Sequence, residues 1–100
     1  MKNVSEKDVK EVLSKVIHPE INYSLVELGM IKDIKVEDNV ISITLTLPFL
    51  DVPIKEDLIN LVKEALKSLN NDMEIKMNIA EMDEEERERF MILARKGWKV

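Results

Sequence analysis

The sequence predicts one small α+β domain, residues 1–100, in which helices cover the apolar face of a three-stranded mixed sheet. Apolar residues recur at helical spacing in three segments and alternate with polar residues in three others, in the order α-β-β-α-β-α. A tight turn joins the first two strands, whereas a helix joins the second to the third. The pattern therefore predicts an antiparallel hairpin followed by a crossover.

The first helix should begin at Ser5 and end just before Pro19. Ser5 and Asp8 stand at the spacing of a capping box, and Val4 and Val9 flank it as a hydrophobic staple would. Because proline cannot continue a helix and moves the preceding residue out of helical geometry, it predicts the stop. The expected apolar stripe is Val9, Val12, Leu13, Val16 and Ile17.

A β-hairpin should follow. Apolar and charged residues alternate over about 30–37, and Asp38 and Asn39 can take the positive φ angles of a tight turn. The second strand, 40–47, alternates strictly. Ile41, Ile43, Leu45 and Leu47 should face one way, and Ser42, Thr44 and Thr46 the other.

The second half of the chain predicts two helices around a third strand. Residues 48–53 form a loop, and Asp51 and Pro53 suit the first turn of the next helix. Asp83 can cap a last helix over about 83–96, which is acidic at its beginning and basic at its end, as the helix dipole favours. The middle helix should bury Ile54, Leu58, Leu61, Val62, Ala65, Leu66 and Leu69, and the strand alternates Met73, Ile75, Met77 and Ile79.

Composition excludes most common catalytic and binding classes. The net charge is −5 and lysines are interleaved with acids, so no nucleic-acid surface is expected. With no cysteine, one histidine and two glycines, the chain lacks thiolate nucleophiles, thiolate-ligated metals and Gly-rich phosphate loops. No apolar run could span a bilayer and no signal peptide is visible, which predicts a cytoplasmic protein. We therefore expect no catalytic residue, no cofactor, no metal and no membrane association.

The stretch from His18 to Ile31 is the main candidate for function. Pro19 and Gly29 are expected to act on the backbone, as a helix stop and as a position of positive φ or close packing. Glu20 and Glu27 can be solvated carboxylates or can accept backbone amides of the loop.

Other polar residues also have two interpretations. Thr44 and Thr46 suit an exposed strand face by β-propensity alone. His18, Glu20 and Asp51 could together hold a divalent metal, since one imidazole and two carboxylates match non-haem iron or hydrolytic zinc. A loop histidine, however, is more commonly a surface residue.

Two further groups are expected to be structural. The acidic run 84–88 predicts a solvated helix face, or else a docking surface for a basic protein. Methionines suit gaps in the core; they are Met73, Met77, Met82 and Met91.

Four motifs follow one another: His18-Pro19-Glu20, Glu27-Leu28-Gly29-Met30-Ile31, Thr44-Leu45-Thr46 and Pro53 at the second helix. They resemble the SufT/PaaD-like metal–sulfur cluster biosynthesis family, the small iron–sulfur cluster assembly domain also known as domain of unknown function fifty-nine. That family carries Asp-Pro-Glu, Asp-Leu-Gly-Leu-Ile, Thr-x-Thr and Cys-Pro in this order. The resemblance covers about residues 5–80, and the acidic helix at 83–96 is similar to versions associated with cluster-carrier ATPases.

The resemblance implies iron–sulfur cluster assembly or delivery by an accessory or targeting factor, with an iron–sulfur scaffold or cluster-carrier ATPase as partner. Some relatives instead serve phenylacetate-degradation oxygenases through metal-centre maturation. The family's reactive cysteine precedes the proline of the second helix, where this chain has Asp51 and Val52. Because His18 also replaces the family aspartate, the chain either works as a scaffold or has lost the ancestral activity.

We therefore predict a non-catalytic accessory factor that acts through protein contacts. Its candidate partner-binding residues are His18, Glu20, Glu27, Thr44, Thr46 and Asp51. One alternative is a general interaction module, including a homodimer paired through an exposed sheet edge. Another is a small metal-dependent enzyme that uses His18, Glu20 and Asp51.

Overall fold

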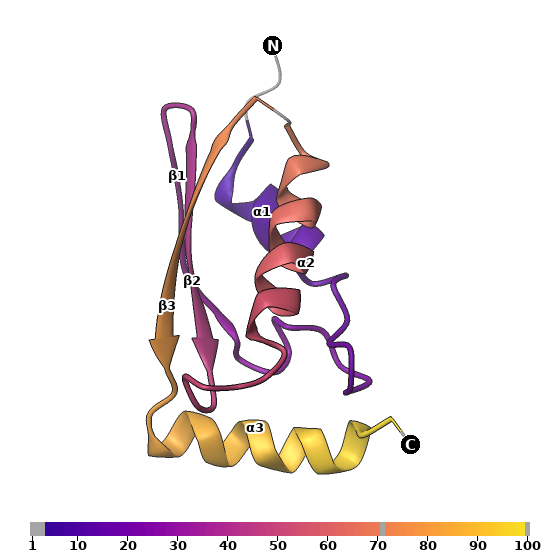
Figure 1. The fold of residues 1–100 in the computed structure, drawn as a ribbon. Helices are drawn as coiled ribbons and strands as arrows, with labels where there is room; N and C mark the ends of the chain where they lie inside the picture. Colours follow the sequence, from indigo (N-terminus) through magenta and orange to yellow (C-terminus); the bar gives the residue numbers. More distant parts are fainter. Residues whose placement is uncertain (1–3, 71, 100) are drawn as a thin grey trace.

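A computed structural model describes residues 4–70 and 72–99 and contains the predicted elements in the predicted order (Figure 1). They are α1 (Glu6–Leu13), β1 (Ile31–Glu37), β2 (Val40–Leu47), α2 (Lys55–Lys67), β3 (Glu74–Glu81) and α3 (Glu84–Gly97). The predicted α+β class and mixed sheet are confirmed. No helix in the described ranges is long and apolar enough to cross a membrane.

The central strand of the sheet is β2, which pairs antiparallel with β1 and parallel with β3. In the turn between β1 and β2 only Asp38 takes a positive φ, 52°. Asp33 also has a positive φ, 51°, where the register shifts between Lys32 and Lys35. This irregularity interrupts the pairing along β1, and the alternating pattern gave no sign of it.

The core lies between the sheet and the two helices α1 and α2, which cover one of its faces (Figure 1). The four apolar side chains of β2 that were predicted to share one face are fully buried, and so are the central apolar residues of both helices. These residues are Ile41, Ile43, Leu45, Leu47, Val9, Leu13, Leu58, Val62 and Leu66. Apolar burial of this extent is the main stabilising term of the fold.

The third helix, α3, lies across the end of the sheet, where β2 and β3 finish (Figure 1). Asp83 caps it as predicted: its carboxylate accepts the Glu86 N–H at 2.8 Å, and Glu86 in turn accepts the Asp83 N–H at 3.0 Å. Phe90 turns inward and is buried. A Cβ on Gly97 would lie 2.7 Å from ring carbons of Tyr23, so close packing at the end of α3 requires glycine.

The first helix is shorter than predicted. It begins with the Ser5–Asp8 capping box but ends at Leu13, because the chain then turns back on itself. The Val16 carbonyl accepts the Leu25 N–H at 2.9 Å in place of a helical partner. Ile17 is consequently 47% exposed and lies outside the apolar stripe in which it was expected.

The second helix also begins later than predicted. Its first residue is Lys55, and the residue before it, Ile54, makes no side-chain hydrogen bond to the helix. Asp51 and Pro53 therefore belong to the loop rather than to the first turn.

Candidate functional site

The loop from residue 18 to residue 31 is closed by its own hydrogen bonds. The Glu27 carboxylate accepts the Ser24 N–H at 2.8 Å, and the Ser24 hydroxyl accepts the Glu27 N–H at 3.1 Å. Gly29 has a φ of 75° and nothing within 4 Å of a Cβ position, so the backbone angle alone requires glycine there. Glu27 was expected to be either a solvated carboxylate or an acceptor for backbone amides of the loop. The structure shows that it accepts a backbone amide of the loop.

His18 lies at the centre of the site and is only 3% exposed, so the expectation of a surface histidine was wrong. Its ring Nδ1 accepts the backbone N–H of Glu20 at 3.0 Å. The backbone N–H of His18 donates to the Tyr23 carbonyl at 3.0 Å. The ring meets that of Phe90 edge-on, with centroids 6.5 Å apart. Burial lowers the pKa of His18 because desolvation disfavours the imidazolium; Glu20 opposes this effect and Lys99 adds to it.

Beside His18 lies a cavity of about 140 Å³ that three separate segments enclose. His18 and Glu20 come from the loop, Val52 from the segment before α2, and Phe90 and Trp98 from α3 and the residue after it. Most of the lining side chains are apolar, and the two titratable ones are His18 and Glu20.

The structure brings together only part of the predicted set. His18 and Glu20 both line the cavity, whereas Asp51 is exposed on its loop and Glu27 lines a different hollow of about 290 Å³ beside α3. Within residues 4–70 and 72–99, no three His, Cys, Asp or Glu side chains are placed to hold a metal ion.

The two threonines lie on the sheet face opposite α1 and α2. Thr44 is half-buried between Lys32 and Asn78 on the neighbouring strands. Thr46 is 1% exposed, and its N–H donates to the Met30 carbonyl at 2.7 Å. Its hydroxyl oxygen has no hydrogen-bond partner in the described part of the chain. A side chain so enclosed cannot contact a partner protein directly.

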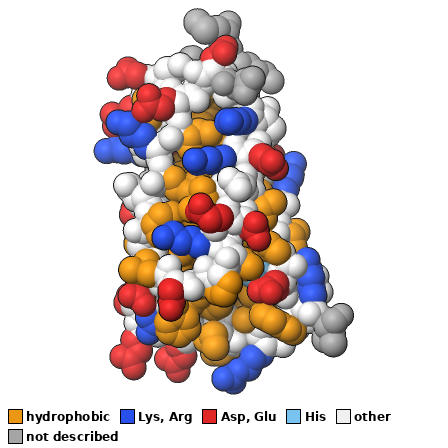
Figure 2. Space-filling view, in the orientation of Figure 1, with side chains coloured by type: hydrophobic (Ala, Val, Ile, Leu, Met, Phe, Trp, Pro, Cys, Tyr) orange, Lys and Arg blue, Asp and Glu red, His pale blue; other side chains and the backbone are white. Residues whose placement is uncertain are grey.

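Three large apolar side chains that the sequence analysis did not select are exposed around the cavity: Trp98 lines it, and Phe49 and Leu50 lie in the loop between Pro48 and Val52, which both line it. We call Phe49, Leu50 and Trp98 the rim cluster; they are 48%, 50% and 53% exposed. Figure 2 shows hydrophobic side chains gathered at the end of the molecule where α3 lies. Met91 on α3 is 41% exposed as well, so its expected place in the core was wrong.

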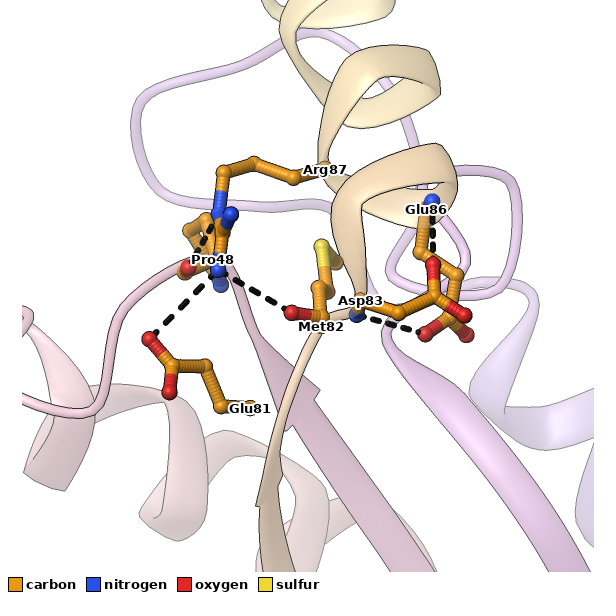
Figure 3. Close-up of polar contacts among 6 residues, drawn as sticks. All are labelled: Pro48, Glu81, Met82, Asp83, Glu86 and Arg87. Atoms are coloured by element: carbon orange, nitrogen blue, oxygen red, sulfur yellow. Dashed lines mark hydrogen bonds and ion pairs between the residues drawn. The ribbon is translucent and has the colours of Figure 1, made fainter.

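Arg87 of α3 holds the loop that carries Phe49 and Leu50 of the rim cluster (Figure 3). Its Nε donates to the Pro48 carbonyl at 2.9 Å, and its Nη2 donates to the Met82 carbonyl at 3.0 Å. The same Nη2 lies 3.5 Å from a carboxylate oxygen of Glu81, and the guanidinium carbon lies 4.9 Å from the centre of the Phe49 ring. One cation therefore ties the ends of β2 and β3 to α3.

The residues after α3 close the other side of the site. Trp98 forms an antiparallel bridge with Ile21, and the Lys99 N–H donates to the Glu20 carbonyl at 3.0 Å. The Lys99 ammonium also donates to the His18 carbonyl at 3.2 Å. These contacts fix the loop against the end of α3.

The family model described as iron–sulfur cluster assembly protein matches residues 6–77, which include the loop, the hairpin and the segment before α2. The chain belongs to this family. The motif-based recognition is thereby confirmed. Of the two residues at the position of the family's cysteine, Val52 lines the cavity and Asp51 does not.

A crystal structure of a domain of unknown function, DUF59, from Bacillus anthracis is similar to this chain, with a TM-score of 0.71. The two are 25% identical, and the alignment covers 89% of this chain and 91% of the other. A comparison with curated proteins gave no match.

Proposed function

We propose that this chain is a non-catalytic accessory factor of iron–sulfur cluster assembly, and that it binds an assembly protein with the surface around the His18 cavity. Membership of the family supports a role in iron–sulfur cluster assembly. The observation that carries the mode of action is the rim cluster, three half-exposed apolar side chains beside a cavity that has no thiol.

The rim cluster has the properties of a binding surface. Large exposed apolar side chains around a cavity commonly mark an interaction site, and aromatic residues dominate the binding energy of such sites. Arg87 holds Phe49 in place, so less conformational entropy is lost when a partner binds. The partner we propose is an iron–sulfur scaffold or a cluster-carrier ATPase.

The groups around the cavity support a role without catalysis. The Nδ1 of His18 is already engaged by the Glu20 N–H, and burial favours the neutral ring. Val52 offers neither a nucleophile nor a metal ligand. In this proposal the exposed side chains of Glu20 and Asp51 face the partner. His18 and Thr46 are buried and support the binding surface from beneath, and Glu27 lies beside it.

The test is an anaerobic pull-down from the native organism's lysate, with the wild-type chain, a Leu50→Asp/Trp98→Ala variant and a matched Ile17→Ser control. Ile17 is an apolar side chain of similar exposure that does not line the cavity. Quantitative mass spectrometry should find a cluster scaffold or carrier ATPase with the wild type and the control. The rim variant should recover roughly tenfold less or lower still. Circular dichroism checks that both variants are folded.

Three results would contradict the proposal. If the rim variant recovered as much scaffold or carrier ATPase as the wild type, the rim cluster would not be part of the interface. Recovery of only unrelated proteins, or of the chain itself, would favour the general interaction module. A stoichiometric metal in the purified protein would favour the metal-dependent enzyme.

A further inference from the structure

The outward face of α3 carries a stripe that the site does not use. Glu84, Glu88, Met91, Ile92 and Arg95 are spaced at i, i+4, i+7, i+8 and i+11, which places them on one side of a helix. With Arg87 they line an open groove of about 470 Å³. We call these five residues the outer stripe.

The outer stripe has an apolar centre between charges of opposite sign. Met91 is 41% and Ile92 is 49% exposed at its centre. The neighbouring Phe90 and Leu93 turn toward the core, so the run of four apolar residues gives α3 two apolar faces. One face packs on the domain, and the other has no partner among the described residues.

We propose that a second copy of this chain covers the outer stripe, with the two α3 helices packed antiparallel about a two-fold axis between Met91 and Ile92. In this arrangement Met91 of each copy meets Ile92 of the other. Glu88 and Arg95 lie equally far from the axis, about 5 Å along the helix at 1.5 Å per residue. Each Glu88 therefore faces Arg95 of the other copy, and the pair occurs twice.

The order of charges along the outer stripe favours a second copy of this chain as the partner and an antiparallel arrangement of the two α3 helices. Figure 2 shows acidic side chains gathered at the left end of α3, where its N-terminus lies. A parallel pair would place Glu88 beside Glu88 and Arg95 beside Arg95, which is unfavourable. In residues 4–70 and 72–99, neither side chain has an ion-pair partner within the chain. A surface that matches its own copy when reversed is what an isologous dimer requires.

The proposal differs from pairing through a sheet edge and does not depend on the proposed function. The edge at β1 is interrupted by the irregularity at Asp33, which discourages addition of another strand there. A pair of helices this short buries a small interface, so we expect a dissociation constant between about 10 and 500 µM.

The experiment is sedimentation velocity on the full chain from about 5 to 500 µM, with Glu88→Arg, Arg95→Glu and an equimolar mixture of the two variants. Each variant alone brings like charges together and should raise the dimer Kd roughly tenfold or more. In the mixture, one copy supplies two arginines and the other two glutamates, so both pairs re-form. The mixture should dimerise about as well as wild type. Glu64→Arg, an exposed position on α2, is the matched control.

Dimerisation of the mixture together with loss in each variant establishes the antiparallel pairing, because no fold defect could be repaired by mixing. A wild type that stays monomeric at about 500 µM overturns the proposal. The proposal is also overturned if the two variants dimerise like the control, or if the mixture stays monomeric while the wild type dimerises. Capture of the assembly partner tests the rim cluster, so the two proposals can fail separately.

Discussion

The ring of His18 accepts a hydrogen bond from the backbone of the loop that follows it. An aspartate in this place can accept the N–H two residues later, which stabilises a turn. Here Nδ1 of the imidazole accepts the Glu20 N–H at 3.0 Å. The imidazole thus supplies the acceptor for this turn without a negative charge, and its ring is buried against Phe90.

Replacing His18 with asparagine should make stability less dependent on pH. Burial lowers the pKa of His18 in the folded chain below 6.5, so the unfolded chain takes up the proton first as pH falls. The stability contributed by the neutral ring is complete above about pH 7.5 and is lost as pH falls past 6.5 and through the folded pKa. Asparagine keeps an acceptor but cannot ionise.

The measurement is the free energy of unfolding in urea at about pH 7.5 and pH 5.5 for both proteins. The wild type should lose more stability than His18→Asn, since the carboxylates that titrate are common to the two. Equal losses would mean that burial does not shift this pKa.

Thr46→Val should increase stability. The threonine hydroxyl is buried without a hydrogen-bond partner in the described residues, and valine has nearly the same shape. Removing an unsatisfied buried hydroxyl should raise the free energy of unfolding by about 1–2 kcal/mol. Thr44→Val, at a half-buried position on the same face, should give a smaller gain. A loss at position 46 would show that the hydroxyl is hydrogen-bonded in solution.

At the scale of elements, the signals that predicted the structure are those within a few residues of one another. The Ser5–Asp8 capping box, the Asp83 cap and the alternation along β2 are local, and all were confirmed. The Ser24–Glu27 pair has the same Ser-x-x-Glu spacing and could have been found in the sequence.

The end of α1 was not predictable in this way. It depends on the hydrogen bond between Val16 and Leu25, which forms only once the loop has folded. Proline marked where a helix could not continue, but tertiary pairing ended it several residues earlier.

Arg87→Ala should loosen the loop that carries Phe49 and Leu50. The change removes hydrogen bonds to the Pro48 and Met82 carbonyls and the cation–π contact with Phe49. We expect a loss of about 1–3 kcal/mol in the free energy of unfolding. Amide hydrogen exchange over residues 49–54 should also accelerate.

Arg87→Lys is the conservative control for this prediction. Lysine keeps the charge but cannot reproduce the planar, forked set of donors, so it should recover only part of the stability. Unchanged exchange in Arg87→Ala would show that the loop is held by other contacts.

At the scale of the whole molecule, α3 should open more readily than the sheet. The helix lies across the end of the sheet, and its buried residues are few: Phe90, Ala94 and Gly97. The strand β2 is instead paired on both sides and covered by two helices. Native-state hydrogen exchange at low protein concentration should give α3 amides an opening free energy about 1–2 kcal/mol or more below that of β2 amides. Equal values would mean that the domain opens as one unit.

The candidate site shows the limit of sequence analysis most clearly. The motifs located the loop, and the structure places His18 and Glu20 together at the cavity. Trp98 could not be foreseen, because no local pattern says that a residue after the last helix returns to the first loop. Arg87 is likewise 39 residues from its acceptor in Pro48.

The contact between Lys99 and His18 also sets an order of events in biosynthesis. The two residues are 81 positions apart, and at roughly 5–20 residues per second the ribosome needs about 4–16 s to make the chain between them. The hairpin and α2 are therefore made before the residues that hold the loop in place. Until then the imidazole has no α3 to cover it. A nascent chain thus carries a site that α3 and Lys99 have not yet closed.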